Sequence, residues 1–164
     1  NMSDNWLKQI PDSIGYYLTG FADGEGSFNV SLRNKKDYAN NWQICPCFNV
    51  SQKDITILTK FKRYLGCGKI KKRKDAMYMY EVINYQMLSS RVIPYFRKFS
   101  FLSASKQTNF SIFCQILDTM NGEHLTKDGF KKIILLREKL NIGKGRTRKY
   151  HIENIYGESS ETIR

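Results

Sequence analysis

Apolar and polar side chains alternate along four stretches of the chain, the period-two pattern of strands with one buried face. The stretches run over residues 27–35, 42–51, 69–74 and 77–83. The first two are separated by a polar turn at 36–41 and the last two by Asp75-Ala76, so the pattern predicts two β-hairpins. Pro46 interrupts the second stretch and predicts an edge position or a bulge there.

Apolar residues at helical spacing predict helices before, between and after the hairpins. These helices run over residues 13–22, 54–65, 87–99, 105–120 and 126–140, with a further helical turn at 151–156. The second helix has an apolar stripe of Ile55, Leu58, Phe61 and Leu65. Gly66 predicts the end of that helix.

Charged side chains on one face of each strand imply a sheet that helices cover on its other side only. We therefore expect an α+β fold. It has an αββαββα core with a four-stranded antiparallel sheet, over about residues 13–120, and a C-terminal helical extension over about 121–164. The 164 residues are enough for one domain with a real core, so 1–164 is expected to be a single domain.

The end of the first helix carries two carboxylates. Residues 23–26 read Asp-Gly-Glu-Gly, in which glycine allows positive φ and close backbone approach, and a strand follows at once. Asp23 and Glu25 are thus expected at a helix C-terminus beside the sheet. Local physics leaves two interpretations open, a helix end with solvated acids or a site that uses a carboxylate.

The wider sequence around this junction resembles the signature of a known family. Residues 17–27, YLTGFADGEGS, are similar to the motif of the LAGLIDADG homing endonucleases. A weaker similarity lies at 48–53, FNVSQK, where the family has a polar, often glutamine, residue at a strand end. Another lies at 105–110, SKQTNF, which is similar to a Lys-Gln segment that opens a helix near the active site. The resemblance implies the same αββαββα core.

The resemblance also implies a metal-dependent active site. By position, Glu25 is the metal ligand together with the backbone carbonyl of Gly24, and the metal is normally Mg²⁺, with Ca²⁺ or Mn²⁺ able to replace it in assays. Gln52 corresponds to a residue that positions water, and Lys106 to a basic residue that organises solvent or stabilises charge. Thr56 stands where some members have an arginine, so the supporting residues depart from the family pattern.

The chain carries one copy of the motif, whereas cutting both strands of a duplex requires two active sites. We therefore expect a homodimer with a two-fold axis between the first helices, because glycines four residues apart let helices approach closely. The expected interface residues are Thr19, Gly20, Asp23 and Gly24. Close packing within one chain is the other explanation of the glycine spacing. For Asp23, a helix cap or an interface hydrogen bond is favoured over metal binding.

The charge balance indicates a polyanionic partner. Lysine and arginine number 27 against 15 acidic residues, which gives a formal charge of +12. No apolar run approaches the roughly 20 residues that span a bilayer, and this favours nucleic acid over a membrane. The polar strand faces carry side chains of the kinds that contact DNA bases: Asn29, Ser31, Arg33, Lys35, Gln43, Asn49, Lys69, Lys71 and Arg73. An ordinary solvated sheet face is the alternative, and the basic loop at 143–149 is expected to contact phosphates.

Cysteine usage argues against zinc. Cys45, Cys47, Cys67 and Cys114 lack the paired spacing of a zinc site. Cys45 and Cys47 lie two apart on one strand face and are expected to be free thiols, which indicates a reducing compartment. The first residues show neither a secretory signal nor an Arg-rich presequence. Localisation stays open between a prokaryotic cytoplasm and an organelle with its own protein synthesis.

Together these features predict a DNA endonuclease, a phosphodiester hydrolase. The expected activity is that of an intron-encoded homing endonuclease, which uses Mg²⁺ to hydrolyse both strands of a long pseudo-palindromic double-stranded DNA target as a homodimer. Two alternatives on the same scaffold are an intron RNA maturase and a catalytically silent DNA-binding protein. Glu25 and Gln52 favour the enzyme, since a silent binder needs no acid aimed at a phosphate.

Overall fold

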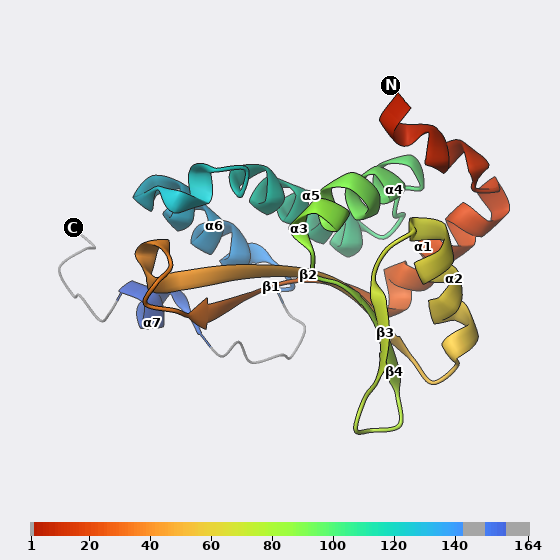
Figure 1. Cartoon of the computed structure of the whole chain (residues 1–164), viewed down its shortest axis with the longest axis horizontal. Coiled ribbons are helices and arrows are strands. Elements are labelled where there is room, and N and C mark those ends of the chain that lie inside the picture. Colours follow the sequence, from red (N-terminus) through yellow and green to blue (C-terminus); the bar gives the residue numbers. More distant parts are fainter. Residues whose placement is uncertain (1, 143–149, 157–164) are drawn as a thin grey trace.

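The computed structural model describes residues 2–142 and 150–156, so the predicted basic loop at 143–149 lies outside it. At its centre is a four-stranded antiparallel sheet in the order β1-β2-β4-β3 (Figure 1). The strands are β1 (Gly26–Asn34), β2 (Trp42–Gln52), β3 (Lys69–Lys72) and β4 (Tyr78–Val82). Both predicted hairpins are present, and they join through β2 and β4.

Burial alternates along the strands as predicted. In β1, Phe28, Val30 and Leu32 are buried, whereas Ser31 and Arg33 are exposed. The buried positions face the helices and the exposed positions face solvent, so the sheet has one apolar and one polar face.

Pro46 lies inside β2, where it pairs with Val30 of β1. The pairing of β2 with β4 begins only at Phe48, opposite Val82. At Pro46 the strand therefore has one neighbour, and proline is tolerated at such an edge. The predicted edge position thus holds for the part of β2 around Pro46, whereas the part from Phe48 onward lies between β1 and β4.

Helices cover the apolar face of the sheet (Figure 1). The α-helices are α1 (Asp12–Glu25), α2 (Ile55–Leu65), α3 (Tyr85–Met87), α4 (Ile93–Lys98), α5 (Ala104–Thr119), α6 (Lys127–Lys139) and α7 (Ile152–Tyr156). Three 3₁₀ segments are η1 (Met2–Gln9), η2 (Ala39–Asn41) and η4 (Glu123–Leu125), and η3 (Leu88–Val92) is a π-helical turn. The order matches the predicted αββαββα core with a helical extension. None of the described helices is long and apolar enough to cross a membrane.

The helix predicted over 87–99 is divided. It consists of α3, the π-helical turn η3 and α4 in succession. Pro94 stands in the first turn of α4 and has no N–H to donate to the preceding turn, so a regular α-helical ladder cannot run through this point.

The helix α2 has the predicted ends and, except at Ile55, the predicted buried stripe. Asp54 accepts a hydrogen bond from the N–H of Thr56 (2.8 Å), and Gly66 closes the helix with a φ of 68°. Ile55, however, is 41 % exposed, and the neighbouring buried position belongs to Ile57.

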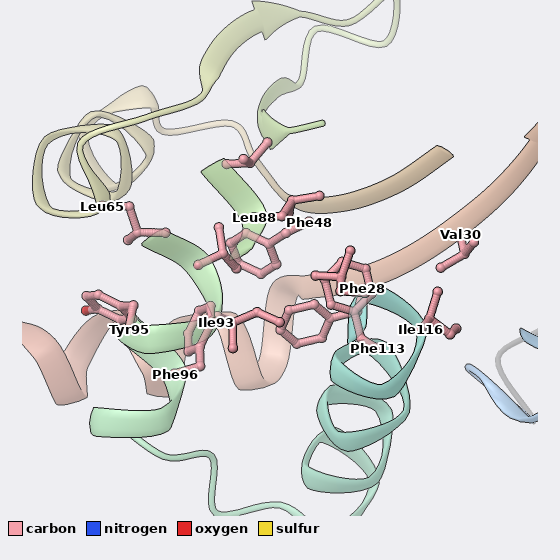
Figure 2. Close-up of a cluster of buried hydrophobic side chains, with 14 of the residues drawn as sticks. Phe28, Val30, Phe48, Leu65, Leu88, Ile93, Tyr95, Phe96, Phe113 and Ile116 are labelled. Carbon is pink, nitrogen blue, oxygen red and sulfur yellow. The ribbon is translucent and has the colours of Figure 1, made fainter. Parts of the chain in front are cut away.

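Phenylalanine rings dominate the core between the sheet and the helices (Figure 2). Phe28 of β1 lies among them, with five other phenylalanine rings at centroid distances of 5.0–5.8 Å. These are Phe48, Phe96, Phe101, Phe110 and Phe113. They belong to β2, α4, the α4–α5 loop and α5, so aromatic burial anchors the beginning of β1 to every layer of the core.

The C-terminal extension closes the free edge of β1. Arg137 of α6 is buried, and its Nε donates a hydrogen bond to the carbonyl of Val30 (2.6 Å) while its Nη1 donates to that of Tyr150 (2.8 Å). Asn141, just after α6, donates from Nδ2 to the carbonyl of Phe28 (2.7 Å). An open sheet edge can pair with another chain, and these side chains occupy it instead.

Candidate active site and nucleic-acid interface

Glu25 is the last residue of α1, and its side chain is exposed. The sequence predicted a helix end near Ala22, but the helix continues to Glu25. The N–H of Gly26 donates to the carbonyl of Ala22, and the φ of Gly26 is −84°. A Cβ on Gly26 would lie 2.7 Å from that carbonyl oxygen, so close approach rather than positive φ requires glycine here. Glu25 therefore stands where the helix meets the sheet.

Gln52, the last residue of β2, lies at the same edge of the sheet as Glu25. Gly26, next to Glu25, pairs with Val50, two residues before Gln52. The Oε1 atom of Gln52 accepts a hydrogen bond from the N–H of Lys53 (2.8 Å), which leaves the amide NH₂ group to face other partners. The structure thus brings the two predicted active-site residues to one edge.

Lys106, in the first turn of α5, is only 2 % exposed. Its Nζ donates a hydrogen bond to the carbonyl of Gly26, and its N–H donates to Oγ of Ser103 (3.3 Å), the N-cap of α5. The side chain of Lys106 lies beneath the site and contacts the backbone next to Glu25, and its role of organising solvent or stabilising charge stays a prediction. A buried ammonium requires such partners, and it ties α5 to the α1–β1 junction.

Asp23 links α1 to α5 within the chain. Its carboxylate accepts hydrogen bonds from Ser103, through the N–H (3.1 Å) and through the hydroxyl. Burial raises the pKa of Asp23, but the hydrogen bonds from Ser103 and Leu102 outweigh it, so the pKa lies below its ordinary value. Of the two roles expected for Asp23, the carboxylate forms the cap, inside the subunit at the start of α5, and its contact with a second subunit stays a prediction.

One face of α1 presents small and aromatic residues to solvent. Gly20 and Gly24 are exposed, and a Cβ on either would meet no atom within 4 Å. Tyr16 and Tyr17 lie on the same side of the helix and are 56 % and 63 % exposed. We call these four residues the exposed α1 face. Thr19 is not part of it, which corrects its expected interface role, because Thr19 is buried and its hydroxyl donates to the carbonyl at the end of α4 (2.9 Å).

Oxygen atoms at the end of α1 are the donors that this chain offers to a metal. The last helical hydrogen bond runs from Gly26 to Ala22, so the carbonyl of Gly24 has no partner in the helix ladder, and Glu25 adds an exposed carboxylate. Such oxygens suit a hard divalent cation, which a helix C-terminus also favours. The described residues contain no group of three or more His, Cys, Asp and Glu side chains able to hold a metal. A metal at Glu25 would therefore take its remaining donors from water, from a bound phosphate or from a second subunit.

The polar face of β1 and β2 holds most of the predicted DNA-contacting residues. Facing pairs on this side of the sheet are Asn29–Cys47, Ser31–Cys45, Arg33–Gln43 and Asn49–Glu81. The Oε1 atom of Gln43 is buried without a hydrogen-bond partner among the described residues, so it can still accept one. Cys45 and Cys47 are free thiols, as expected. Lys35 lies just beyond β1, with its Nζ 5.3 Å from the ring centre of Tyr38.

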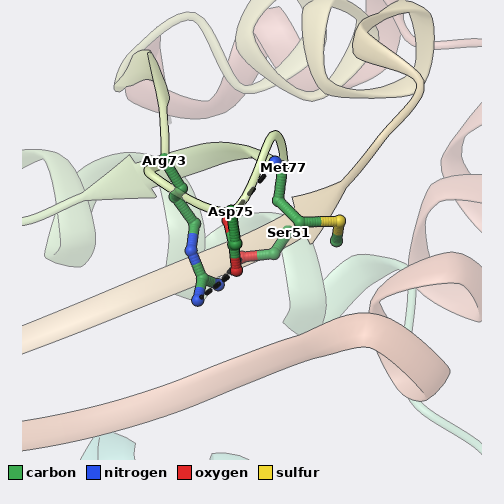
Figure 3. Close-up of polar contacts among 4 residues, drawn as sticks. All are labelled: Ser51, Arg73, Asp75 and Met77. Carbon is green, nitrogen blue, oxygen red and sulfur yellow. Dashed lines mark hydrogen bonds and ion pairs between the residues drawn. The ribbon is translucent and has the colours of Figure 1, made fainter.

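The hairpin of β3 and β4 adds basic side chains that already have acidic partners. Lys71 forms an ion pair with Glu81 (2.6 Å), and Lys69 is exposed opposite the same glutamate. Figure 3 shows Arg73 between Asp75, at 3.1 Å, and Ser51 of β2, at 3.3 Å. The acidic partners were not predicted from the sequence.

The position of Glu81 could have been predicted. Strand alternation places it on the same face of β4 as Met79, and Met79 pairs with Lys71 of β3. Asp75 was assigned to the turn alone. Its ion pair with Arg73 depends on how the turn folds back, which alternation does not predict.

The sequence profile of the LAGLIDADG endonucleases matches residues 18–117, more than half of the chain. The chain belongs to the LAGLIDADG endonuclease family. Apart from Tyr17, this LAGLIDADG match contains all three segments whose resemblance was noted in the sequence, including Glu25, Gln52 and Lys106.

Solved LAGLIDADG structures share the fold. The archaeal intron-encoded homing endonuclease I-Vdi141I, solved in complex with DNA, is 30 % identical with a TM-score of 0.82, and the match covers 88 % of this chain and 92 % of that one. I-SmaMI, solved on its uncleaved DNA target in the presence of calcium ions, is 31 % identical with a TM-score of 0.74, over 77 % of this chain and 44 % of that one.

Curated LAGLIDADG-type relatives are longer than this chain. The probable intron-encoded endonuclease 2 of Neurospora crassa is 31 % identical over 144 residues, which cover 85 % of this chain and 32 % of that protein. The chain spans between 24 % and 32 % of the length of this relative and of two others.

Proposed function

We propose that this chain is an intron-encoded homing endonuclease, which hydrolyses both strands of a long pseudo-palindromic DNA duplex with Mg²⁺ as a homodimer. The observation that carries the proposal is the exposed Glu25 carboxylate at the edge of a basic sheet face, beside Gln52. A protein that only bound DNA would gain nothing from an acid there, because a carboxylate repels phosphate.

The polar face of the sheet is the proposed DNA-binding surface. Arginine, lysine and amide side chains on a two-stranded ribbon can reach base edges in the major groove. The net charge of +12 supports a strong electrostatic contribution from phosphate contacts. I-Vdi141I, which shares this fold, is solved in complex with DNA.

The exposed α1 face is the proposed contact with a second copy of the chain. Its glycines leave room for another helix, and its tyrosines supply apolar area for burial. A two-fold axis at this face would bring two Glu25 side chains together, because Glu25 ends the same helix. The second subunit would thus add its own Glu25 carboxylate and Gly24 carbonyl to the donors that the described residues of one chain offer.

The residues at this edge have separate roles in the proposed reaction. Glu25 and the carbonyl of Gly24 hold Mg²⁺, which supplies water activation and charge neutralisation when bound. Gln52 donates from its amide to orient the attacking water. Lys106 is a positioning residue that keeps the α1–β1 junction, and with it Glu25, in place through the Gly26 carbonyl.

Replacing Glu25 tests the proposal. A library of randomised duplexes is first incubated with the protein and Mg²⁺, and sequencing of the cut ends gives the target. On that target, Glu25→Gln should lose cleavage in Mg²⁺ and keep binding in Ca²⁺, because the amide keeps the shape but not the charge that holds the cation.

Glu123→Gln, at an exposed glutamate in η4, is the control for loss of one negative charge and should cut like the wild type. Cleavage by Glu25→Gln at close to the wild-type rate would place the active site elsewhere. Binding without any cleavage by the wild type would favour the silent DNA-binding protein.

A further inference from the structure

Asn141 reaches from the C-terminal extension to the polar face of β1. It follows the C-cap of α6, Leu140, and has a φ of 58°, a left-handed conformation that asparagine tolerates. Its N–H donates to Oδ1 of Asn109 on α5 (3.1 Å), and Asn109 is itself buried, so the position of Asn141 is fixed by the core.

The hydrogen bonds of Asn141 determine which way its amide points. The carbonyl of Phe28 can only accept, so the atom of Asn141 that lies 2.7 Å from it must be the NH₂ nitrogen. That nitrogen has a second hydrogen, which is donated to Oδ1 of Asn29 at 3.4 Å. Asn29 must therefore turn its oxygen toward Asn141.

We infer that Asn141 sets the base that Asn29 reads, by holding the Asn29 amide with its NH₂ group toward the DNA. The inference rests on the proposed function, in which the polar sheet face enters the major groove. It assigns to the C-terminal extension a part in specificity, through a residue that does not itself need to touch DNA.

The fixed amide favours guanine over adenine at one position in each half-site. An asparagine that reads adenine uses both its oxygen and its nitrogen, because adenine presents one acceptor and one donor. Here the oxygen of Asn29 is directed at Asn141, and the NH₂ group would meet the amino group of adenine donor to donor. Guanine presents two acceptors, N7 and O6, and matches the donors that Asn29 offers.

Asn141→Gly separates this role from folding. Glycine suits a φ of 58° and keeps the N–H that bonds Asn109, so the backbone contact survives while the side chain is removed. Thermal melting checks that the variant is folded. Duplexes selected from a randomised library by binding in Ca²⁺ then give the base preference at every position.

The wild type should prefer guanine over adenine at one position per half-site by about three- to tenfold, the worth of one hydrogen bond. Asn141→Gly should make the two bases equal there, because the Asn29 amide can then turn over, and should leave the other positions unchanged. Asn121→Gly, an exposed asparagine just after α5, is the control and should select like the wild type.

A second variant keeps Asn141 in place. Asn29→Asp still accepts from Asn141 but offers only acceptors to the groove, so the preference should move from guanine to cytosine, whose N4 group donates.

An unchanged preference in Asn141→Gly, or in Asn29→Asp, would overturn the inference. If the wild type itself showed no base preference at any position, the sheet would not read DNA bases, and the proposed function would be refuted with the inference.

Discussion

Single residues fix the backbone on both sides of Glu25. Asp23 accepts hydrogen bonds from Ser103, and the carbonyl of Gly26 accepts one from Lys106, so both contacts lead to the first turn of α5. Glu25 lies between these two anchors with its own side chain free to face solvent. The backbone is thus held in place before a cation binds, and only the side-chain rotamers of Glu25 remain to be ordered, which favours catalysis by pre-organisation.

The Asp23 anchor should make stability depend on pH. Its folded pKa lies below the ordinary value of 3.8, so its contribution is complete above pH 3.8 and is lost as the pH falls through the folded pKa. Asp23→Asn should lower the free energy of unfolding by about 1 kcal/mol at pH 7, and the difference should shrink below pH 3.8. Urea unfolding at pH 7, 5 and 3 measures this.

Asp37→Asn, in the exposed turn between β1 and β2, is the control for loss of a carboxylate and should show no such trend. A destabilisation by Asp23→Asn that stayed constant from pH 7 to pH 3 would mean that the charge of Asp23 has no part in the cap.

At the scale of elements, α1 uses glycine differently on its two sides. A Cβ at Gly15 would lie 2.3 Å from the ring of Phe99, so this glycine allows close packing inside the subunit. Gly20 lies on the exposed α1 face, where a Cβ meets nothing. Gly15 was not part of the predicted spacing of Gly20 and Gly24. Close packing within the subunit does not explain that spacing, because a Cβ at Gly20 or Gly24 meets no atom within 4 Å, and the dimer stays a prediction for this side of the helix.

Gly20→Leu should dissociate the proposed dimer without unfolding the subunit. The monomer has room for the side chain, and leucine favours a helix over glycine by roughly 1 kcal/mol, so thermal stability of the monomer should hold or rise. Sedimentation should show monomer, and cleavage of both strands should fail. Thr59→Leu places a leucine on the exposed side of α2, away from the exposed α1 face, and as a control for an exposed leucine it should remain dimeric. An intact, active Gly20→Leu dimer would contradict pairing through this face.

The sequence predicted elements well where one side of each is buried. Alternation located all four strands, and Asp54 and Gly66 gave the ends of α2 correctly. Prediction failed where distant segments decide the outcome. The bonds of Asp23 to Ser103 and of Lys106 to Gly26 each span 80 residues, and no local period reports them. The sequence therefore predicted that Asp23 and Lys106 have polar roles near the site, but only the folded structure shows which residues they contact.

At the scale of the whole molecule, the basic residues fall into two groups. Some belong to the polar sheet face, where neighbours hold them in defined positions, as Asp75 and Ser51 hold Arg73. Others, such as Lys74 at the tip of the β3–β4 hairpin, are exposed to solvent. The first group suits base recognition and the second suits phosphate contact.

This division predicts different effects on DNA binding. Lys74→Ala should weaken binding to all sequences and reduce the slope of log affinity against log salt by about 0.9, the value for one phosphate contact. Arg33→Ala should relax the preference at one position per half-site, at a cost of about 1 to 3 kcal/mol. Titrations at several salt concentrations on matched and mismatched duplexes measure both. Equal losses for every base at every position in Arg33→Ala would argue against direct reading by the sheet.

The length of β2 has a consequence for how rare a target would be. Its 11 residues extend about 36 Å, which corresponds to about ten base pairs of B-DNA. A pair of subunits would then face about twenty base pairs, and a word of that length recurs by chance once in about 10¹² positions, against the 10⁶–10⁹ competing sites of a genome. The target would therefore stay unique in a genome even if the protein did not recognise the base at several positions. A target whose sequence changes at those positions between hosts would still be bound.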